Sequence, residues 1–323
     1  MLRFGCIDQL ADRCSTVGVP LQLTQLEGGA CSGDLLPLQI GPLQLLRIRL
    51  NKSVHAAGPK LNGRHMFTLG LKANPLDRQL ISHGQQLPAP AIFGFDPQRR
   101  DVHLTTPSTL SLAMVSIDQK HFHQWAGELG SAGLEEEILR RNWLRVEPRR
   151  FEDLSLYLQQ IFEGAAVAPG RFKDPSNSRL AQQDLLPLLV ETLLQGSDRV
   201  AGLGRPPARI ELVKQAERWM EEHPCEPITL DTLCRQLFTS RRNLIQGFRD
   251  HLGMGPMAYL KRLRLHQIRH LLRAADPQAT NIAQLAAQWG FLSPGHFSSD
   301  YRKQFGELPS KTLQCQAQRG LRH

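Results

Sequence analysis

The feature that most constrains the fold of this chain is a pair of short helices that occurs twice in its last third. In the first copy, a short apolar helix at about residues 231–237 precedes a tight turn and the stretch SRRNLIQGFRDHLG, residues 240–253. That stretch opens with a capping serine and closes with a glycine, which are typical helix boundaries. The same order returns at about residues 281–289 and 293–305, where Ser293 is the cap. One copy is a weak signal, but two copies joined by one helix predict two helix-turn-helix units.

The segment between the two copies, about residues 256–275, predicts a helix that sets their spacing. About 20 residues of helix span about 30 Å, and B-DNA presents its major groove on one face about every 34 Å. A rigid helix of this length can therefore hold two recognition helices in consecutive major grooves. On this helix Arg262, Arg269 and Arg273 share one face. Arg264 falls among apolar residues and is expected to form a structural salt bridge.

The outer face of residues 240–253 carries hydrogen-bonding side chains that a packed core does not use. Arg242 and Gln246 lie one helical turn apart, and such side chains read guanine and adenine in the major groove. The second copy has no Arg, Lys, Gln or Asn at the outward positions that would meet bases, so we expect it to hold phosphates and to read few bases. The predicted DNA-binding residues are Arg241, Arg242, Asn243, Gln246 and Arg249 in the first copy and Ser293, His296, Ser299, Arg302 and Lys303 in the second.

Charge is distributed unevenly along the chain. Residues 205–323 carry 18 Lys and Arg against 10 Asp and Glu, whereas residues 1–204 carry 21 against 20. Such asymmetry is typical of a polyanion-binding module joined to a near-neutral one. At roughly 150 residues per domain, the length of the chain also predicts two domains.

The first 194 residues predict a domain in which strands precede helices. Short apolar runs cut by Gly and Pro between about residues 20 and 117 indicate an antiparallel sandwich or barrel. Helical patterns follow over about 118–194, and a linker rich in Gly and Pro occupies 195–208. The expected fold class is therefore α+β, with antiparallel strands and helices in residues 1–194 and an all-α domain in residues 209–323.

The motifs of the last third together resemble the AraC/XylS family of bacterial transcription regulators. The resemblance covers about residues 209–315 and rests on LCRQLFTSRRNLIQGFRDHLGMGPMAYLKRLRL and IAQLAAQWGFLSPGHFSSDYRKQFGELPS. It implies an N-terminal sensing and dimerising domain, often a cupin-like barrel, ahead of a domain that binds promoter DNA. It also implies a homodimer that activates transcription through contact with RNA polymerase, with a small molecule as a candidate effector. The family usually has a small residue at the position of Phe238.

A finer resemblance points to one branch of this family. The pieces SRR, LKRLRL and QWGF resemble the regulator of the ethanolamine-utilisation operon. An N-terminal domain that binds a protein partner in place of a small molecule remains an alternative. A small-molecule pocket is expected among aromatic residues such as Phe67, Phe93 and Phe95, which otherwise form barrel core.

Other side chains give no catalytic or metal-ligating pattern. His121 and His123 form the only close histidine pair, in a segment that reads as the start of a helix and is expected to be a solvated face. The stretch GGACSG, residues 28–33, reads as a turn. A cupin-like enzyme with an appended helical domain is the second function class, but it needs a His and Glu metal constellation within residues 20–115, and none is evident. We therefore expect no enzyme activity, cofactor, metal or catalytic residue.

Cysteine usage and hydropathy favour a cytoplasmic protein. The six cysteines show neither CxxC nor metal-ligand spacing. No apolar run approaches the roughly 20 residues of a membrane span, and the N-terminus lacks the apolar core of a signal peptide. Two amphipathic segments, about 149–162 and 178–194, have more apolar positions than one packed face requires and are expected to form the dimer contact.

Overall fold

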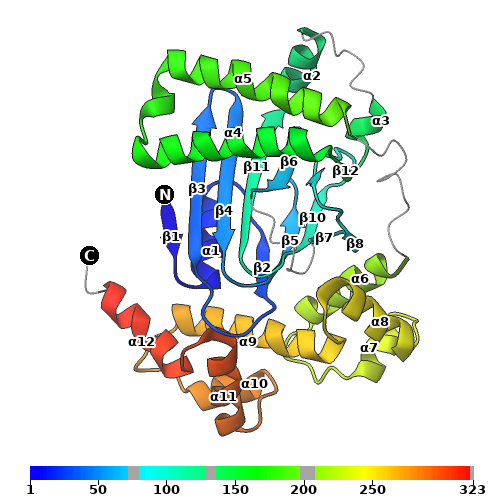
Figure 1. Ribbon diagram of the computed structural model, residues 1–323. Coiled ribbons are helices and arrows are strands. Elements are labelled where there is room, and N and C mark those ends of the chain that lie inside the picture. The colour runs from blue at the N-terminus through cyan, green and yellow to red at the C-terminus, as the bar shows by residue number, and fades with distance from the viewer. Residues whose placement is uncertain (72–79, 129–135, 197–207, 321–323) are drawn as a thin grey trace.

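The computed structural model describes residues 1–71, 80–128, 136–196 and 208–320 (Figure 1). Its strands are β1 (Leu2–Phe4), β2 (Gln22–Gln25), β3 (Gly33–Ile40), β4 (Leu43–Leu50), β5 (Val54–Pro59), β6 (Arg64–Gly70), β7 (Ile81–Ser82), β8 (Gln85–Gln86), β9 (Ala91–Phe93), β10 (Asp101–Thr105), β11 (Leu110–Asp118) and β12 (Trp143–Arg145). Its helices are α1 (Ile7–Thr16), α2 (Gln119–Glu128), α3 (Glu136–Leu139), α4 (Pro148–Val167), the 3-10 helix η1 (Arg171–Lys173), α5 (Pro175–Leu194), α6 (Ala208–Glu222), α7 (Leu230–Gln236), α8 (Arg241–Leu252), α9 (Pro256–Ala274), α10 (Ile282–Gln288), α11 (Pro294–Phe305) and α12 (Pro309–Gly320).

The strands form two antiparallel sheets. The larger sheet has the order β1-β3-β4-β11-β6-β9-β12, and the smaller has the order β2-β5-β10-β7-β8. Helices α4 and α5 lie side by side across the outer face of the larger sheet (Figure 1). This arrangement confirms the predicted α+β class with an antiparallel N-terminal β domain and an all-α C-terminal part.

The central strands of the larger sheet are apolar on both faces because both faces are covered. Leu36 and Leu45 belong to the core that contains α4 and α5. Their neighbours Leu35 and Leu46 point to the opposite face and pack with α1, since successive side chains of a strand alternate between faces. In β4 the apolar residues therefore change face along the strand. Leu43 and Leu45 face the core of α4 and α5, whereas Leu46 and Leu50 face α1.

Two elements depart from the predicted order of strands and then helices. Helix α1 precedes most of the strands, and it buries Ile7, Leu10 and Cys14. These residues recur at helical spacing and cover the larger sheet. Strand β12 lies within the region that was expected to be helical, where it pairs with β9. Within the described residues no helix is long and apolar enough to cross a membrane.

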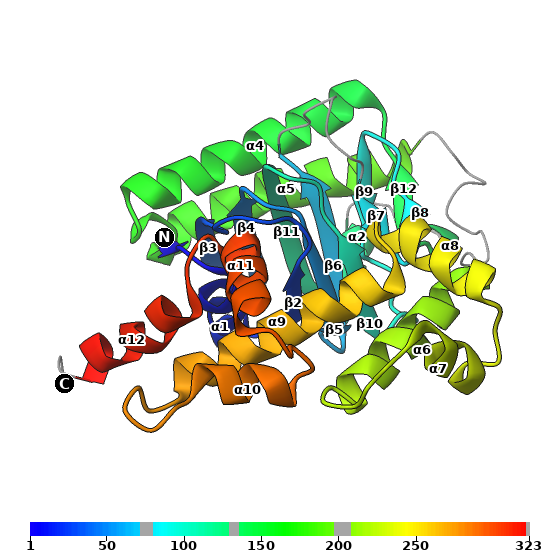
Figure 2. The same ribbon diagram turned by 90° about the horizontal axis from the view of Figure 1, so that it is seen from below.

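The C-terminal helices are built around α9. Its first half packs in one apolar core with α6, α7 and α8, and its second half packs in another with α10, α11 and α12. With 19 residues, α9 is about 28 Å long. Figure 1 shows α9 beneath the sheets, and Figure 2, seen from below, shows it crossing in front of them with the two groups of short helices near its opposite ends.

The predicted helix starts are present because local capping determines them. Ser240 accepts a hydrogen bond from the amide of Asn243 at the start of α8, and Ser293 accepts one from His296 at the start of α11. Asn281 and Thr229 cap α10 and α7 in the same way. Each cap satisfies an amide that has no partner within its helix.

Candidate nucleic-acid interface

Helix α8 exposes the five side chains that were predicted to contact DNA. Two of them have partners on the protein surface. The guanidinium of Arg241 lies 2.5 Å from a carboxylate oxygen of Asp231, and the amide of Gln246 donates to Asp250 at 2.6 Å. Within the described part of the chain, the side chains of Arg242, Asn243 and Arg249 have no hydrogen-bond or ion-pair partner, and all three are exposed.

Helix α11 exposes a less polar face. Pro294 and Gly295 follow the Ser293 cap, and Asp300 forms an ion pair with Lys261 of α9 at 2.6 Å. The pair compensates the negative charge that would oppose a phosphate. The predicted contacts His296, Ser299, Arg302 and Lys303 are all exposed.

The last turn of α11 also touches the N-terminal domain. The amide of Gly29, in the bend between β2 and β3, donates to the backbone oxygen of Lys303 at 2.9 Å. A Cβ at Gly28 would lie 2.6 Å from the same oxygen, so this approach requires glycine. The predicted turn at GGACSG is thus a contact between the two parts of the molecule, and Lys303 lies at the border of the exposed face.

The basic face of α9 is directed at the protein and not at solvent. Arg269 is buried and lies 2.6 Å from Asp8 of α1 and 2.7 Å from Glu307. Arg273 lies 3.1 Å from Asp12 of α1. These arginines stabilise the packing of α9 on α1, because burial of a charge requires a partner.

Among the residues that the structure describes, Arg264 has no carboxylate partner, so the expected salt bridge is not seen there. The guanidinium of Arg264 donates to the backbone oxygens of Pro224 and Glu226 instead. The role is structural, as predicted, but carbonyl groups that follow α6 take the place of a carboxylate.

Comparison with known proteins places these helices in a family. A family model described as a helix-turn-helix domain matches residues 233–314. The chain is 36% identical over 107 residues to the probable thc operon regulatory protein of Rhodococcus erythropolis. The matched region covers 33% of this chain and 32% of that protein. The chain is also 32% identical over 157 residues to the transcriptional activator RhaS of Enterobacter sp. strain 638. That matched region covers 49% of this chain and 54% of RhaS. The C-terminal helices form an AraC/XylS-family helix-turn-helix domain.

A solved structure that matches a similar share of this chain is that of a probable AraC family transcriptional regulator from Rhodopseudomonas palustris CGA009. It is 37% identical, with a TM-score of 0.31, and the match covers 33% of this chain and 97% of that one. The chain spans about a third to about a half of the length of the curated relatives named above. The similarity is thus concentrated in the AraC/XylS-family domain.

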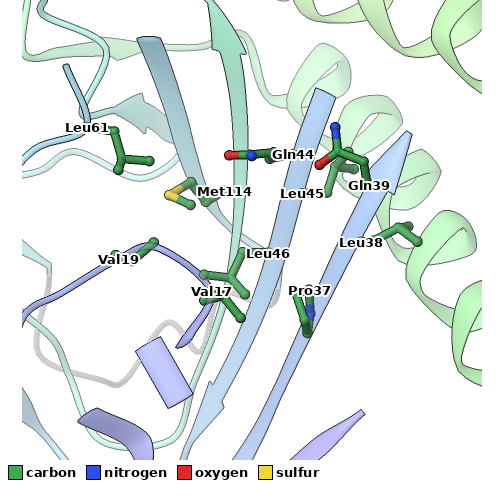
Figure 3. A pocket seen from close by; sticks show the side chains of 10 residues that line it. All are labelled: Val17, Val19, Pro37, Leu38, Gln39, Gln44, Leu45, Leu46, Leu61 and Met114. Carbon is green, nitrogen blue, oxygen red and sulfur yellow. The ribbon is translucent and has the colours of Figure 1, made fainter. Parts of the chain in front are cut away.

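The N-terminal domain contains an apolar chamber between its two sheets. A hollow of about 260 Å³ opens beside α1, and Figure 3 shows Val19, Leu46 and Met114 around it. A second hollow of about 110 Å³ shares these three residues and continues between the sheets. Its polar lining residues are Lys60, Thr68, Ser82, His83, Arg99, Asp101, His103 and Asn142.

The structure separates the three aromatic residues expected near a pocket. Phe93 lines the chamber, whereas Phe67 and Phe95 are buried in the core beneath α4 and α5. Phe67 and Phe95 stack on each other with ring centroids 5.6 Å apart. For these two residues the core interpretation was the right one.

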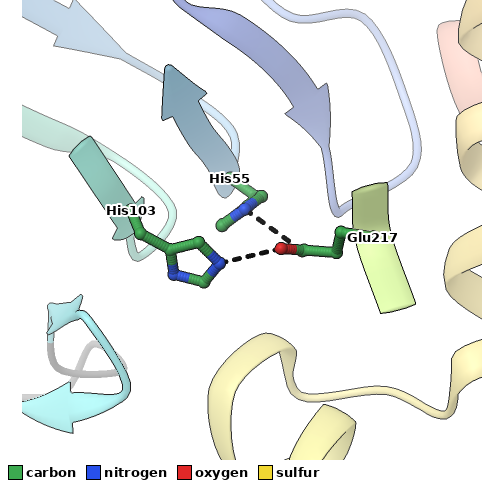
Figure 4. A group of neighbouring side chains, drawn as sticks. All are labelled: His55, His103 and Glu217. Atoms are coloured by element: carbon green, nitrogen blue, oxygen red, sulfur yellow. Dashed lines mark hydrogen bonds and ion pairs between the residues drawn. The ribbon is translucent and has the colours of Figure 1, made fainter. Parts of the chain in front are cut away.

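The histidine pair singled out in the sequence lies on the surface. His121 and His123 are exposed on α2, and His121 lies 3.4 Å from Asp118. A different group of metal-ligand type is formed by His55, His103 and Glu217, all of which are buried (Figure 4). Sequence reasoning missed this His and Glu constellation, because Glu217 is 114 residues from His103 and lies on α6, outside the β region.

Burial determines the protonation of this group. It lowers the pKa of His55 to about 4 and that of His103 to about 3, and it raises the pKa of Glu217. Both rings are therefore neutral near pH 7, and each has one nitrogen with a lone pair. Nε2 of His103 forms a hydrogen bond with Glu217, whereas Nε2 of His55 forms none.

Proposed function

We propose that this protein is a sequence-specific DNA-binding transcription regulator of bacteria and that it acts as an activator. The observation that carries the proposal is the exposed face of α8, where Arg242, Asn243 and Arg249 have no partner within the described residues. Unpaired polar side chains on a recognition helix suit base edges and phosphates. Most of the relatives and neighbours named above are called transcriptional activators or regulators.

Binding of duplex DNA and its dependence on salt test this proposal. Because Lys and Arg release condensed counterions from phosphates, the affinity of the full chain for its site is expected to fall steeply as salt rises. Sites are first obtained by footprinting on genomic DNA. The affinity is then measured by fluorescence anisotropy on a selected site and on a scrambled duplex. An affinity that is independent of salt, or equal on both duplexes, contradicts a sequence-specific regulator.

We further propose that residues 1–194 sense a signal and dimerise, and that 195–208 link them to the domain at 209–323. The chamber between the sheets supports a small-molecule effector, since it is apolar with a few polar groups. Ligand density there would separate this idea from control by a protein partner. Exposed Leu156 on α4 and Leu180 on α5 support a dimer contact. A monomer in light scattering at micromolar concentration rules that contact out.

The family resemblance of the last third of the chain supports three more specific assignments. We propose the ethanolamine-operon branch, contact with RNA polymerase and a cytoplasmic location as parts of this function. Protection of an ethanolamine-operon promoter in footprinting supports the branch, and protection of unrelated promoters alone contradicts it. The enzyme alternative has less support, because the single carboxylate of the only His and Glu cluster found among the described residues comes from α6 and not from residues 20–115.

A further inference from the structure

The cluster of His55, His103 and Glu217 lies where the two parts of the chain meet. His55 is on β5 and His103 is on β10, and these strands pair so that His55 is opposite Thr105. Glu217 is on α6, the first helix of the DNA-binding domain. Figure 4 shows the two rings and the carboxylate pointing toward one another. The three ligand atoms lie within 4.8 Å of one another.

The distances in the cluster suit a metal ion. Nε2 of His103 lies 2.9 Å from one oxygen of Glu217, and Nε2 of His55 lies 3.3 Å from the other. Zinc binds such atoms at about 2.0–2.2 Å in a tetrahedron, which places neighbouring ligand atoms about 3.4 Å apart. Only a small expansion of the cluster is needed.

Two buried atoms of the cluster lack a hydrogen bond. Nε2 of His55 and Oε1 of Glu217 lie 3.3 Å apart without one, and the hydroxyl of buried Tyr259 is a further polar neighbour of the Glu217 side chain. Buried polar atoms of this kind are uncommon in folded proteins, and a bound ion is one explanation of them. A cation between the two atoms would satisfy both and would compensate a buried carboxylate.

The neighbours of the cluster orient the ligands. Nδ1 of His55 lies 3.1 Å from the hydroxyl of Thr105. If that nitrogen carries the proton, Nε2 presents its lone pair to Glu217, which is the arrangement of a metal-bound histidine. Lys214 lies one turn before Glu217, but it is paired with Asp101 at 2.6 Å, so its charge is compensated.

We propose that His55, His103 and Glu217 bind one divalent transition-metal ion, of which zinc fits the ligand set best. Two imidazoles and a carboxylate favour zinc over calcium or magnesium, which prefer oxygen ligands. The ion would join α6 to the smaller sheet and so fix the DNA-binding domain against the N-terminal domain. His103 also lines the chamber, which places the ion between the chamber and α6.

The consequence for the recognition helix follows from the packing of α6. A Cβ at Gly247 of α8 would lie 3.1 Å from Val213 of α6, so the two helices are in close contact. An ion that holds α6 therefore also restricts α8. The proposed site would let metal availability bias the position of the first recognition helix, whether or not an effector occupies the chamber.

Metal binding by the full chain, without DNA, tests the inference. The protein is first freed of metal with a chelator and kept reduced. Zinc is then titrated in competition with a chromophoric chelator, and cobalt is bound in its place for absorption spectroscopy. We expect one tight equivalent and the visible bands of tetrahedral cobalt without a thiolate-to-metal band, because no cysteine belongs to the cluster.

Variants assign the site. Glu217→Gln keeps the shape of the side chain and is expected to weaken zinc binding about 100-fold or more, since even partners outside the ligand shell cost 10–100-fold. His121→Ala removes an exposed histidine and is the control that should bind like the parent protein. Thermal unfolding should respond to zinc in the parent and the control but not in Glu217→Gln.

Three outcomes overturn the proposal. They are equal binding by the parent protein and Glu217→Gln, a thiolate band in the cobalt spectrum, or no equivalent tighter than exposed histidines provide. The last result would leave the cluster as a hydrogen-bonded triad. If Glu217→Gln fails to fold, the zinc affinity of His55→Gln and the cobalt spectrum of the parent protein decide whether the cluster binds the metal. Because no readout uses DNA, failure here leaves the proposed function standing.

Discussion

Arg241 and Arg242 are adjacent in the chain but have different environments. Arg241 is held by Asp231, whereas Arg242 has no partner in the described residues. Arg242→Ala is therefore expected to cost about 1–3 kcal/mol of binding free energy and to relax the preference at one base position. Anisotropy on duplexes that vary one base at a time measures both effects. Arg241→Ala is the matched comparison, and a loss from Arg242→Ala that is equal on every duplex would show a phosphate contact instead.

Phe238 is strained and exposed in the turn between α7 and α8. Its φ is 48°, and 97% of the residue is accessible to solvent. The second copy has Gly290 with a φ of 85° in the corresponding turn. Phe238→Gly should relieve about 1–2 kcal/mol of left-handed strain and should lose about 0.5–1 kcal/mol to the entropy of the unfolded chain.

The expected result for Phe238→Gly is a free energy of unfolding that is unchanged or up to about 1.5 kcal/mol higher. Urea denaturation of the full chain measures it. Gly290→Ala is the opposite change in the other turn and should destabilise the protein. A clear loss of stability in Phe238→Gly would mean that the ring makes a stabilising contact and that strain is not the dominant effect.

At the scale of elements, helices with local end signals were predicted well. Ser240 and Gly253 bound α8 almost at the residues expected, because capping depends only on neighbouring residues. Strands β5 and β10 carried no comparable signal. The segment VHAAGP of β5 is poor in β-branched residues, and its stability comes from pairing with β10 and β2.

The predicted DNA-binding residues differ in how far the sequence could define them. Exposure of Arg242 and His296 followed from helical periodicity. The pairing of Gln246 with Asp250 spans one helical turn and was also accessible from the sequence. The pairing of Asp300 with Lys261 was not, because it depends on how α11 crosses α9.

The two recognition helices predict an asymmetric half-site. Helix α8 exposes Arg, Asn and Gln side chains of the kind that can read bases, whereas α11 exposes mainly His296, Ser299 and groups suited to phosphate. A randomised-site selection should therefore give a block of base pairs with strong base preference opposite α8. A second block, one helical turn away and opposite α11, should show weak base preference. Shape readout can add some preference in the second block. Equal information in both blocks would show that α11 reads bases as well as α8 does.

At the scale of the whole molecule, α9 and α11 join the two halves through buried polar contacts with β2. The side-chain amide of Gln304 donates to the backbone oxygen of Gln25 on β2, and that of Gln25 donates to the backbone oxygen of Gln304. The backbone amide of Gln25 donates to Nε2 of His266 on α9 at 3.0 Å. These contacts join residues about 240–280 positions apart, so no local sequence pattern predicts them.

His266 should make the stability of this arrangement depend on pH. Burial lowers the pKa of His266 to about 4, and only the neutral ring can accept the hydrogen bond of Gln25. The unfolded chain takes up a proton near pH 6.5, so between pH 6.5 and about 4 it binds more protons than the folded protein. Stability is thus fully present above pH 6.5 and is lost as pH falls through this range, by about 2 kcal/mol from pH 7 to 5 for one such histidine.

A variant separates this titration from simple packing. His266→Gln removes the ionisable ring, so its free energy of unfolding should fall by about 2 kcal/mol less than that of the parent protein between pH 7 and 5. Urea denaturation at the two pH values measures the difference. His270→Gln, an exposed position on the same helix, should keep the parent pH dependence. If His266→Gln lowers stability equally at both pH values, the histidine contributes packing alone, and the acid sensitivity of the molecule must arise elsewhere.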